Sequence, residues 1–382
     1  MTDKPLAGRK ILYLVTEDWY FWSHRLPMAR AARAAGADIV VACRVSNHGD
    51  RIRDEGFELV EIPFDRSGLN PVRDFGTVRH ILSAYKTVRP DLVHHVALKP
   101  SLYGALAAWL AGVPAVVNAM AGMGFMFISD SFKARLLRPA IKRAFRWFNN
   151  RQNTRVVVQN GDDARLFERD FGVKADHIRI IPGSGVDIEK FQPTSEPSGM
   201  PVAVCISRML WDKGIGELVE AARLLKKRGV ALTIRLVGPT DANPASVSPD
   251  QLARWQQEGV VDVAGASDDV SGEYARAHIA VLPSYREGLP KSLLEAAACG
   301  RPMVATDVPG CREVCLDGRT GLLVPAQSVD ALADALQRLA SDPSLRQQFG
   351  AEARELVETK LADHVIARQT VDLYVELVGQ GR

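Results

Sequence analysis

The chain has 382 residues, too many for one ordinary hydrophobic core, so its length predicts two domains. Its composition, 47% hydrophobic and 24% charged residues, is that of a soluble globular protein. The net charge of +3 is too small to indicate a nucleic acid as partner.

No apolar run approaches the roughly 20 residues that a membrane-spanning helix needs, and the start of the chain leads into a predicted strand without a signal peptide. We therefore expect a cytoplasmic protein. The cysteines are odd in number and lie mostly in apolar segments, which favours reduced thiols over disulfides. They are Cys43, Cys205, Cys299, Cys311 and Cys315.

Strands and helices alternate through the first half of the chain. Residues 10–16 have the pattern of a buried strand, residues 26–35 that of a helix ending at Gly36, and residues 38–43 that of the next strand. A helix between two such strands predicts a parallel sheet. Later strands are predicted at residues 59–63, 92–96 and 115–119.

Groups typical of ligand sites follow these strands, at the edge where open α/β sheets bind ligands. Residues 17–25 (EDWYFWSHR) contain four aromatic residues, which either stack on sugar rings or pack as a loop plug; we favour binding. This turn has no glycine-rich phosphate motif, which argues against a dinucleotide site. A histidine pair at a strand end, such as His94 and His95, is more often structural than catalytic. The candidate acceptor-side residues are His24, His94, His95, Lys99, Gly122 and Gly124.

Residues 131–155 contain eight Lys or Arg residues and no acidic residue. Phenylalanine, leucine, isoleucine and tryptophan are interleaved with these cations, so the segment resembles a basic amphipathic helix that lies on an anionic membrane surface. A solvated helix with its apolar face in the core is the alternative. We favour the membrane, because a run without any acid is uncommon, and predict docking through residues 133–155.

Residues 191–200 are rich in Pro, Ser and Thr and separate two strand-and-helix series. We therefore expect a domain of residues 1–191 and a second of residues 192–362. Residues 363–382 are predicted to form a helix that crosses back to the first domain. Strands of the second sheet are predicted at residues 202–206, 232–237, 261–263 and 279–282.

Two cations, Arg208 and Lys213, follow the first strand of the second half, just before the predicted helix 215–227. Cations at a strand-to-helix turn can cradle a diphosphate. Ordinary surface charge is the alternative, but their place at the carboxyl end of a first strand favours phosphate binding.

Two carboxylates, Glu287 and Glu295, lie eight residues apart in the segment 283–325. Glu287 is in the loop after a strand, and Glu295 is in an apolar helix predicted at residues 292–299, where burial is costly without a partner. The free N–H groups at the start of this helix would attract a diphosphate. The carboxylates would then accept hydrogen bonds from sugar hydroxyls. The alternative is that Glu287 belongs to an acidic surface loop and Glu295 forms an ion pair, and the spacing alone supports both interpretations equally.

No Asp-x-Asp pair stands at a plausible metal position. The aspartates 162–163 and 268–269 are adjacent, and the second pair is predicted to start a helix. Positive side chains would therefore take the place of a metal ion beside a leaving diphosphate.

Residues 207–214 and 282–325 closely resemble the nucleotide-sugar-dependent glycosyltransferases of family 4, which have the GT-B fold: two α/β Rossmann-like parallel-sheet domains facing a central cleft. The resemblance covers nearly the whole chain, and the family's E-x7-E motif falls on Glu287 and Glu295. It implies that Glu295 binds the nucleotide ribose and Glu287 the sugar hydroxyls. The implied donor-binding residues are Arg208, Lys213, Gly265, Glu287, Gly288, Leu289, Pro290, Ser292 and Glu295, with Glu287, Lys213 and Arg208 as the catalytic group.

The family transfers a sugar with retention of anomeric configuration, without a bound metal or another cofactor. The resemblance implies front-face attack, in which a donor phosphate oxygen takes the acceptor proton. Glu287 is then a positioning group, while Arg208 and Lys213 stabilise the charge that develops on the leaving group.

The first half resembles, more loosely, the branch of this family that extends polyprenyl-diphosphate-linked sugars in bacterial polysaccharide assembly. The matching stretches are HRLP (24–27), HHVALKP (94–100), GMGF (122–125) and GSGVD (183–187). Two departures are aromatic residues in place of the family's glycine pair in the first loop and Ala121 in place of a common histidine.

The working hypothesis is a retaining glycosyltransferase that moves a sugar from a UDP-linked donor to a polyprenyl-diphosphate-linked saccharide, on the inner face of the cytoplasmic membrane. Transfer to a soluble acceptor is one alternative. A non-hydrolysing nucleotide-sugar epimerase, which shares the GT-B fold, is another.

Overall fold

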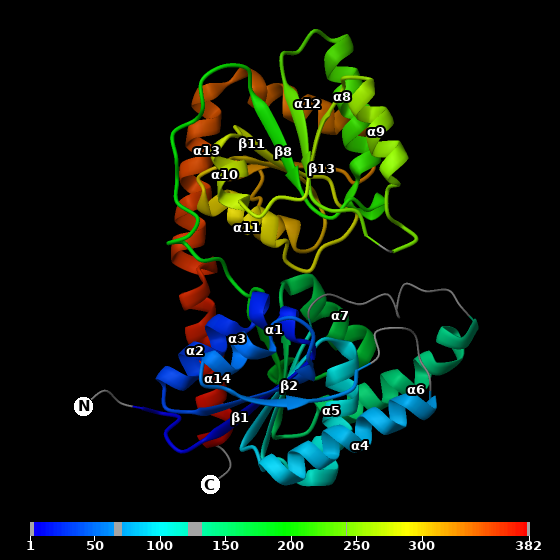
Figure 1. The fold of residues 1–382 in the computed structure, drawn as a ribbon, viewed down its shortest axis with the longest axis vertical. Helices are drawn as coiled ribbons and strands as arrows, with labels where there is room; N and C mark the ends of the chain where they lie inside the picture. Colours follow the sequence, from blue (N-terminus) through cyan, green and yellow to red (C-terminus); the bar gives the residue numbers. More distant parts are fainter. Residues whose placement is uncertain (1–3, 65–70, 121–131, 242, 380–382) are drawn as a thin grey trace. The chain divides into compact units, whose positions relative to one another are not determined.

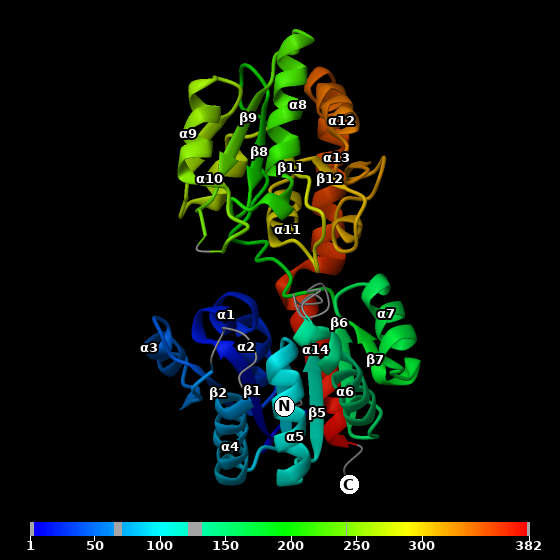
Figure 2. The same cartoon turned by 90° about the vertical axis from the view of Figure 1, so that its right-hand side faces the viewer.

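The computed structural model describes residues 4–64, 71–120, 132–241 and 243–379. The chain divides into two compact units (Figures 1 and 2). Unit 1 comprises Met1–Ser184 and Asp363–Arg382, and unit 2 comprises Gly185–Ala362. Each unit is built on a parallel sheet, as the alternation of strands and helices predicts.

The sheet of unit 1 has the strand order β3-β2-β1-β4-β5-β6-β7 in the described residues. The order reverses between β1 and β4, so their carboxyl ends form the point at which open α/β sheets bind ligands. The strands are β1 (Lys10–Glu17), β2 (Asp38–Arg44), β3 (Glu58–Glu61), β4 (Leu92–Val96), β5 (Ala115–Ala119), β6 (Thr154–Val158) and β7 (Ile178–Ile180).

Helices cover both faces of this sheet, which is why its central strands are buried on both sides and mostly apolar. The core on one face joins the sheet to α2 and α14, and the core on the other joins it to α4 and α5. The helices are α1 (Asp18–His24), α2 (Leu26–Ala34), α3 (Gly49–Asp54), α4 (Pro71–Val88), α5 (Leu98–Ala111), α6 (Phe132–Asn149), α7 (Gly161–Phe171) and α14 (Asp363–Gly379).

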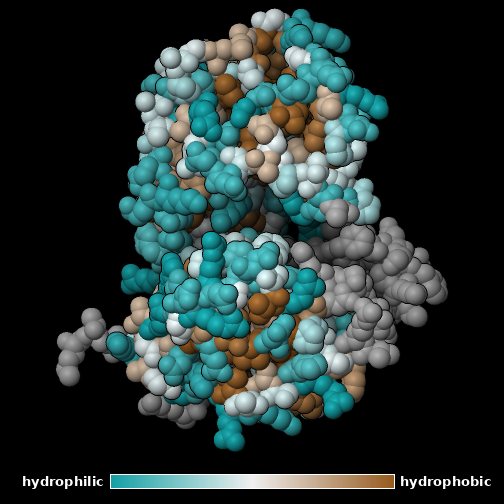
Figure 3. Space-filling model, in the orientation of Figure 1, coloured by the Kyte–Doolittle hydropathy of each residue, from teal (hydrophilic) through white to brown (hydrophobic). Residues whose placement is uncertain are grey.

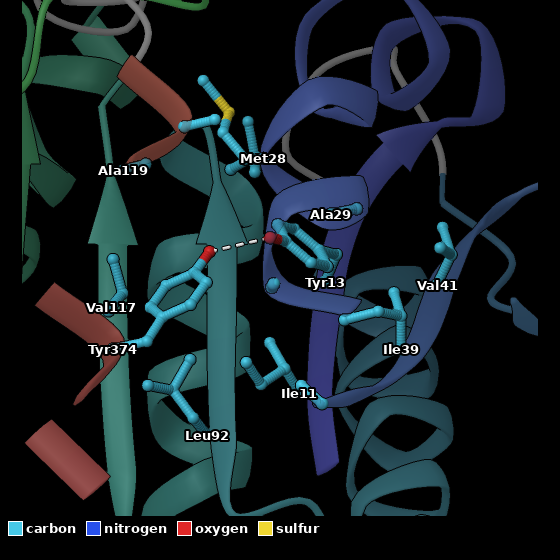
Figure 4. Packing of buried hydrophobic residues seen from close by; sticks show 14 of the residues in the cluster. Ile11, Tyr13, Met28, Ala29, Ile39, Val41, Leu92, Val117, Ala119 and Tyr374 are labelled. Atoms are coloured by element: carbon cyan, nitrogen blue, oxygen red, sulfur yellow. Dashed lines mark hydrogen bonds between the residues drawn. The ribbon is translucent and has the colours of Figure 1, made fainter. Parts of the chain in front are cut away.

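The C-terminal helix α14 completes the core of unit 1. It packs on α2 and carries Tyr374 among the buried side chains of β1, β4 and β5 (Figure 4). The hydroxyl of Tyr374 donates a hydrogen bond of 2.9 Å to the hydroxyl of Tyr13. Arg155 and Arg179 hold the outer face of the helix through Glu376, each with a contact of 3.0 Å.

The sheet of unit 2 has the order β10-β9-β8-β11-β12-β13, so the strand order reverses between β8 and β11. The strands are β8 (Val202–Ile206), β9 (Thr233–Val237), β10 (Asp262–Gly265), β11 (Ile279–Leu282), β12 (Met303–Thr306) and β13 (Gly321–Val324). The helices are α8 (Ile215–Lys227), α9 (Pro249–Gln257), α10 (Val270–Ala275), α11 (Lys291–Ala298), α12 (Val329–Ser341) and α13 (Pro343–Leu356).

Two local predictions have clear outcomes. Residues 17–25 are not a loop, because α1 occupies most of the segment and buries Phe21 against Tyr13 and Phe57. The prediction that the aspartates at 268–269 start a helix is confirmed: the side chain of Asp269 caps α10 by accepting from the N–H of Gly272 at 2.9 Å.

The segment 191–200 packs within unit 2. Phe191 is buried, and Glu196 pairs with the buried Arg346 at 2.7 Å. The five cysteines are buried and free.

The surface in Figure 3 is predominantly hydrophilic, and its hydrophobic residues gather in small groups. None of the helices in the described ranges combines the length and the hydropathy needed to cross a bilayer.

Candidate active site

Two of the predicted donor residues, Lys213 and Glu287, lie at the switch point of unit 2, where the loops after β8 and β11 leave neighbouring strands. Lys213 lies in the first loop, in the 3-10 turn Trp211–Lys213 that precedes α8. Glu287 lies in the second, between β11 and α11. Parallel neighbours end at the same edge of a sheet, so these two loops meet although they are far apart in sequence.

Lys213 and Glu287 form an ion pair at the centre of this site. Lys213 Nζ lies 2.5 Å from Glu287 Oε1, and the same oxygen accepts a 2.7 Å hydrogen bond from Ser284 Oγ. The side chains of Lys213 and Glu287 are 17% and 13% exposed, so both charges are partly withdrawn from water while remaining accessible. A cation and a carboxylate held in this way can be redistributed by a ligand that brings its own charges.

Two glycines allow the backbone of the site to close. Gly214, which directly follows Lys213, has a φ of +70°, and a Cβ there would lie 2.1 Å from the carbonyl oxygen of Pro283. Gly310 has a φ of +83°, and its Cβ would lie 2.3 Å from the carbonyl oxygen of Gly288. Any larger residue would push the Lys213 and Glu287 loops out of place.

A second contact joins the two loops behind the ion pair. The Tyr285 hydroxyl donates a 2.5 Å hydrogen bond to Glu217 Oε1 on α8, and the Tyr285 N–H donates to the carbonyl of Asp212 at 2.9 Å. The loop that carries Glu287 is therefore tied to the start of α8.

Glu295 lies inside α11, with its side chain 12% exposed. Burial raises the pKa of Glu295 to about 7, while the positive charges of Lys291 and Lys190 oppose the rise. Lys291 Nζ is 3.9 Å away, at the limit of an ion pair. A carboxyl group in this state is poised to gain hydrogen-bond donors from a ligand.

Arg208 lies apart from the ion pair and points to a different partner. Its Nη1 donates to Asp241 Oδ2 at 2.7 Å, and its side chain is 56% exposed. The structure therefore pairs Lys213 with Glu287 but pairs Arg208 with Asp241, a residue that the sequence did not single out.

The remaining donor candidates lie around the start of α11. Pro290 precedes the helix and makes no side-chain cap bond, and the N–H of Leu293 donates to its carbonyl at 3.2 Å. The first N–H groups of a helix point beyond its start. The carbonyl of Ser292 accepts from Tyr274 at 2.6 Å, and Leu289 packs on the core. Gly265 ends β10 with a φ of +74° and accepts from the N–H of Gly238 at 2.7 Å.

The acceptor-side candidates belong to unit 1. His24 ends α1, where it stacks on Tyr20 with ring centroids 4.3 Å apart. Lys99, in the first turn of α5, lies 4.0 Å from Asp74. Gly122 and Gly124 lie outside the described residues.

His94 and His95 are both buried in β4. The ring of His95 is bonded on both sides, to Asn118 Oδ1 at 2.7 Å and to the Tyr85 hydroxyl at 2.9 Å, and burial lowers its pKa to about 4. His94 Nδ1 lies 2.5 Å from the Tyr374 hydroxyl. Burial, with Arg25 nearby, holds the pKa of His94 well below its usual range, so both rings are neutral.

Four further residues at these loops were not predicted from the sequence: Ser284, Tyr285, Glu217 and Asp241. Ser284 and Tyr285 stand at the carboxyl end of a predicted buried strand, a signal that could have marked them. Glu217 and Asp241 carry no such signal, because their role depends on contacts across the unit. Across the described ranges, no group of three His, Cys, Asp or Glu side chains is arranged to hold a metal ion.

Two family models match the chain. The model described as glycosyl transferases group 1 matches residues 200–342, which contain the Lys213–Glu287 pair. The model described as glycosyl transferase 4-like matches residues 10–160.

Relatives and a solved structure agree with these matches. A Campylobacter jejuni N,N'-diacetylbacillosaminyl-diphospho-undecaprenol alpha-1,3-N-acetylgalactosaminyltransferase is 28% identical over 93% of this chain and 95% of its own length. An Escherichia coli UDP-Gal:alpha-D-GlcNAc-diphosphoundecaprenol alpha-1,3-galactosyltransferase is 24% identical over 81% of each chain. The Anabaena protein HepE, solved in complex with UDP and glucose, has a TM-score of 0.77 at 18% identity, over 97% of this chain and 100% of HepE.

Proposed function

The chain belongs to glycosyltransferase family 4 and has the GT-B fold, as its sequence motifs predicted, and from that premise we propose retaining transfer of a sugar from a UDP-linked donor to a polyprenyl-diphosphate-linked saccharide. The transferase class rests on the family; donor, acceptor, stereochemistry and metal independence are our proposal. The observation that carries it is the accessible Lys213–Glu287 pair at the switch point of the group 1 domain.

The ion pair suggests how the donor would bind. A donor diphosphate attracts Lys213 away from Glu287. The released Glu287 oxygen then accepts a hydrogen bond from a hydroxyl of the donor sugar. Ser284 keeps the carboxylate in place during this exchange, because it bonds the same oxygen. The positive end of the α11 dipole would meet a phosphate, and Glu295 would meet the nucleotide ribose.

Lys213 would then stabilise the charge that develops on the leaving diphosphate, with the first turn of α11. Arg208 would join them only after leaving Asp241. Glu287 positions the sugar, and a donor phosphate oxygen takes the proton of the attacking hydroxyl. Both named relatives are described as forming an α-1,3 linkage, and one as using UDP-Gal, which supports retention from an α-linked donor.

The acceptor proposal rests on the first unit and on the same relatives. Both are named for acceptors carried on diphosphoundecaprenol, and the chain shares nearly its full length with the first. His24, His94, His95 and Lys99, with Gly122 and Gly124, remain our candidates on this side. We further propose that residues 133–155 hold the enzyme on the anionic inner face of the cytoplasmic membrane, without a nucleic acid partner.

Transfer to a soluble acceptor stays the alternative within this class. The epimerase alternative gains no support from the named relatives, which are transferases.

Radiolabelled nucleotide sugars, offered with and without a polyprenyl-diphosphate-linked monosaccharide, test the proposal. We expect label to enter the lipid fraction only when both substrates are present, without added metal and in the presence of EDTA, and NMR of the product to show an α-linkage. An epimerised nucleotide sugar formed without acceptor would refute the proposal in favour of the epimerase. Label transferred only to a water-soluble sugar would refute the lipid acceptor.

A further inference from the structure

Arg25 differs from the other buried arginines of the described chain in having no partner for one edge of its guanidinium group. Four arginines are buried there: Arg25, Arg155, Arg301 and Arg346. In three of them Nη2 donates to an oxygen, from Glu376 for Arg155, Thr194 for Arg301 and Glu196 for Arg346. Among the described residues, Arg25 Nε and Nη2 have no such oxygen.

Arg346 shows what this edge normally binds. Arg346 and Arg25 are equally buried, each with 4% of its surface exposed. Arg346 uses Nε and Nη2 to hold the two oxygens of Glu196, at 2.7 and 2.9 Å. Arg25 Nη1 is anchored by the carbonyl of His24 at 3.2 Å, which leaves the equivalent edge unoccupied.

The unoccupied edge belongs to a residue that lines a cavity. His94 and Gln159 line it too, and His94 Nε2 is a second buried polar atom without a partner in the described part of the chain. The cavity holds about 10 Å³, the space of a single water molecule or one ligand oxygen. Its other walls come from residues at the ends of β5, β6 and β7, namely Ala119, Met120, Val157, Ile181 and Gly183, with Met28 and Thr370.

The position of this cavity is that of a ligand site. Arg25 follows β1 and α1, and His94 on β4 lies in register with Tyr13 on β1. These are the two strands at which the strand order of unit 1 reverses, and the carboxyl ends of such strands are where open α/β sheets bind ligands.

The missing partner has to supply negative charge as well as a hydrogen-bond acceptor. His94 is neutral, and because its Nδ1 donates to the Tyr374 hydroxyl, its Nε2 is an acceptor. Among the described residues that line the cavity, Arg25 is therefore the charged one. Water in the cavity could accept from the guanidinium but would leave its charge uncompensated, and a buried, uncompensated charge is unfavourable. The side edge of an arginine is matched in geometry to two oxygens of a carboxylate or a phosphate.

We propose that Arg25 is the oxyanion-binding residue of an acceptor subsite in unit 1, and that a phosphoryl oxygen of the acceptor enters the cavity at the Nε–Nη2 edge of Arg25. The choice of a phosphoryl group rests on the proposed function, in which the acceptor sugar is attached to a diphosphate. Arg25 is thereby a specificity-determining residue for the diphosphate-linked acceptor, separate from the donor residues of unit 2.

Binding of inorganic pyrophosphate tests the site without requiring transfer. Pyrophosphate can also occupy the donor site, so the titration uses the full chain with Lys213→Ala. The reporter is His94 Nε2 in spectra of ¹⁵N-histidine-labelled protein, assigned with His94→Gln. We expect the His94 signal to move on titration, and Arg25→Met in the same background to weaken binding at least about tenfold. Unchanged affinity in Arg25→Met overturns the proposal.

The Arg25→Lys variant and a stability measurement distinguish ligand binding by Arg25 from a purely structural role. Lysine keeps the charge but loses the planar edge, so we expect binding intermediate between arginine and methionine. Because Arg25→Met removes an uncompensated charge, its melting temperature should equal or exceed that of the parent chain. A fall of more than about 4 °C, with binding unchanged in Arg25→Lys, assigns Arg25 to the fold and overturns the proposal. Arg30→Met, on the exposed side of α2, is the matched control and should leave pyrophosphate binding unchanged.

The source of the phosphoryl group is tested with farnesyl diphosphate and with farnesol as its uncharged control. Farnesyl diphosphate competing with pyrophosphate, while farnesol does not, supports an acceptor diphosphate. Binding of pyrophosphate alone overturns the acceptor subsite. If Arg25→Met transfers normally with an unchanged acceptor KM, this inference is refuted and the proposed function stands. If binding depends on Arg25 but no sugar is transferred to a lipid, the proposed function is refuted and the site stands.

Discussion

Lys213 Nζ lies 2.5 Å from Glu287 Oε1, although 74 positions separate the two residues in the chain. The pair joins the loop after β8 to the loop after β11. Each charge is balanced by the other, so a single replacement leaves one charge unpaired. A double replacement removes both charges, and the two kinds of variant therefore test different effects.

Lys213→Ala and Glu287→Ala should each leave the fold intact and reduce transfer by two to three orders of magnitude, about the effect of removing one group that stabilises a transition state. The double variant should fall no further than the worse single variant, since both groups act on one donor. Circular dichroism and transfer rates check this, with the exposed Lys227→Ala on α8 as control. Near-normal turnover in either single variant would remove that residue from the active site.

Ser284→Ala tests whether Glu287 needs its second hydrogen bond. The variant removes the hydrogen bond that the Ser284 hydroxyl donates to a charged oxygen, which is worth about 1.5 to 3 kcal/mol, so we expect at least about a tenfold loss in kcat. The donor KM should change less, because Lys213 and the start of α11 remain. Ser207→Ala, whose hydroxyl contacts the backbone of Arg208, should behave like the parent chain. A full loss of activity in Ser284→Ala would mean that the serine does more than position Glu287.

Glu295 should make stability depend on pH. Its pKa in the folded chain is about 7, above that of an unfolded glutamate, so the folded state keeps the proton longer. The stabilisation is fully present below about pH 4.3 and is lost as pH rises through 7, an effect on the order of 2 kcal/mol. Glu295→Gln should flatten this part of the profile in urea unfolding at pH 5 and pH 8. An unchanged pH profile in that variant would place the titration elsewhere.

Nucleotide binding should release a proton from the same group. Ribose hydroxyls that donate to the ionised carboxylate lower its pKa, so UDP binding at pH 7 should be accompanied by proton release. Calorimetry in two buffers of different ionisation enthalpy measures this directly. The parent chain should show the buffer dependence, and Glu295→Gln should not; equal heats for the parent in both buffers would contradict the ribose role.

Gly310→Ala should weaken donor binding through the backbone. The variant combines an unfavourable φ of +83° with a Cβ placed 2.3 Å from the carbonyl oxygen of Gly288, so the loop next to Glu287 has to move. Gly318→Ala is a matched control, with a φ of +70° but no neighbour within 4 Å. Gly318→Ala should lose about 1 kcal/mol of stability from its φ alone, and Gly310→Ala should lose more because of the added clash. Only Gly310→Ala should also lose UDP affinity. Equal UDP affinities would show that this contact does not position the site.

Membrane docking should depend on the C-terminal part of α6. Arg143, Arg146 and Trp147 are exposed there, and Trp147 packs edge-on against Trp109 with ring centroids 5.4 Å apart. Arg143→Glu with Arg146→Glu should abolish flotation with vesicles containing anionic lipid, and high salt should weaken the binding of the parent chain. Arg165→Glu on α7 reverses an exposed charge elsewhere in unit 1 and should float normally. Failure of the parent chain to float would refute docking.

The sequence by itself determined the fold and the residues proposed for the donor site. Runs such as residues 279–282 are apolar throughout, because strands covered on both faces of a parallel sheet need no polar side. Polar groups that follow such strands have to meet at one edge, which is why Lys213 and Glu287 were predicted to belong to one site.

Only the tertiary structure decided which groups share a contact. Arg208 and Lys213 are equivalent as cations in one loop, yet Lys213 reaches Glu287 while Arg208 reaches Asp241. In the sequence, Arg25 is one residue of an aromatic and basic segment. Only the structure shows that Arg25 is buried and that the Nε–Nη2 edge of its guanidinium group contacts no oxygen of the described residues. The sequence pattern gives the polarity and spacing of residues along the chain. Which group a side chain contacts depends on how loops from distant strands meet in space, and this differs from one side chain to the next.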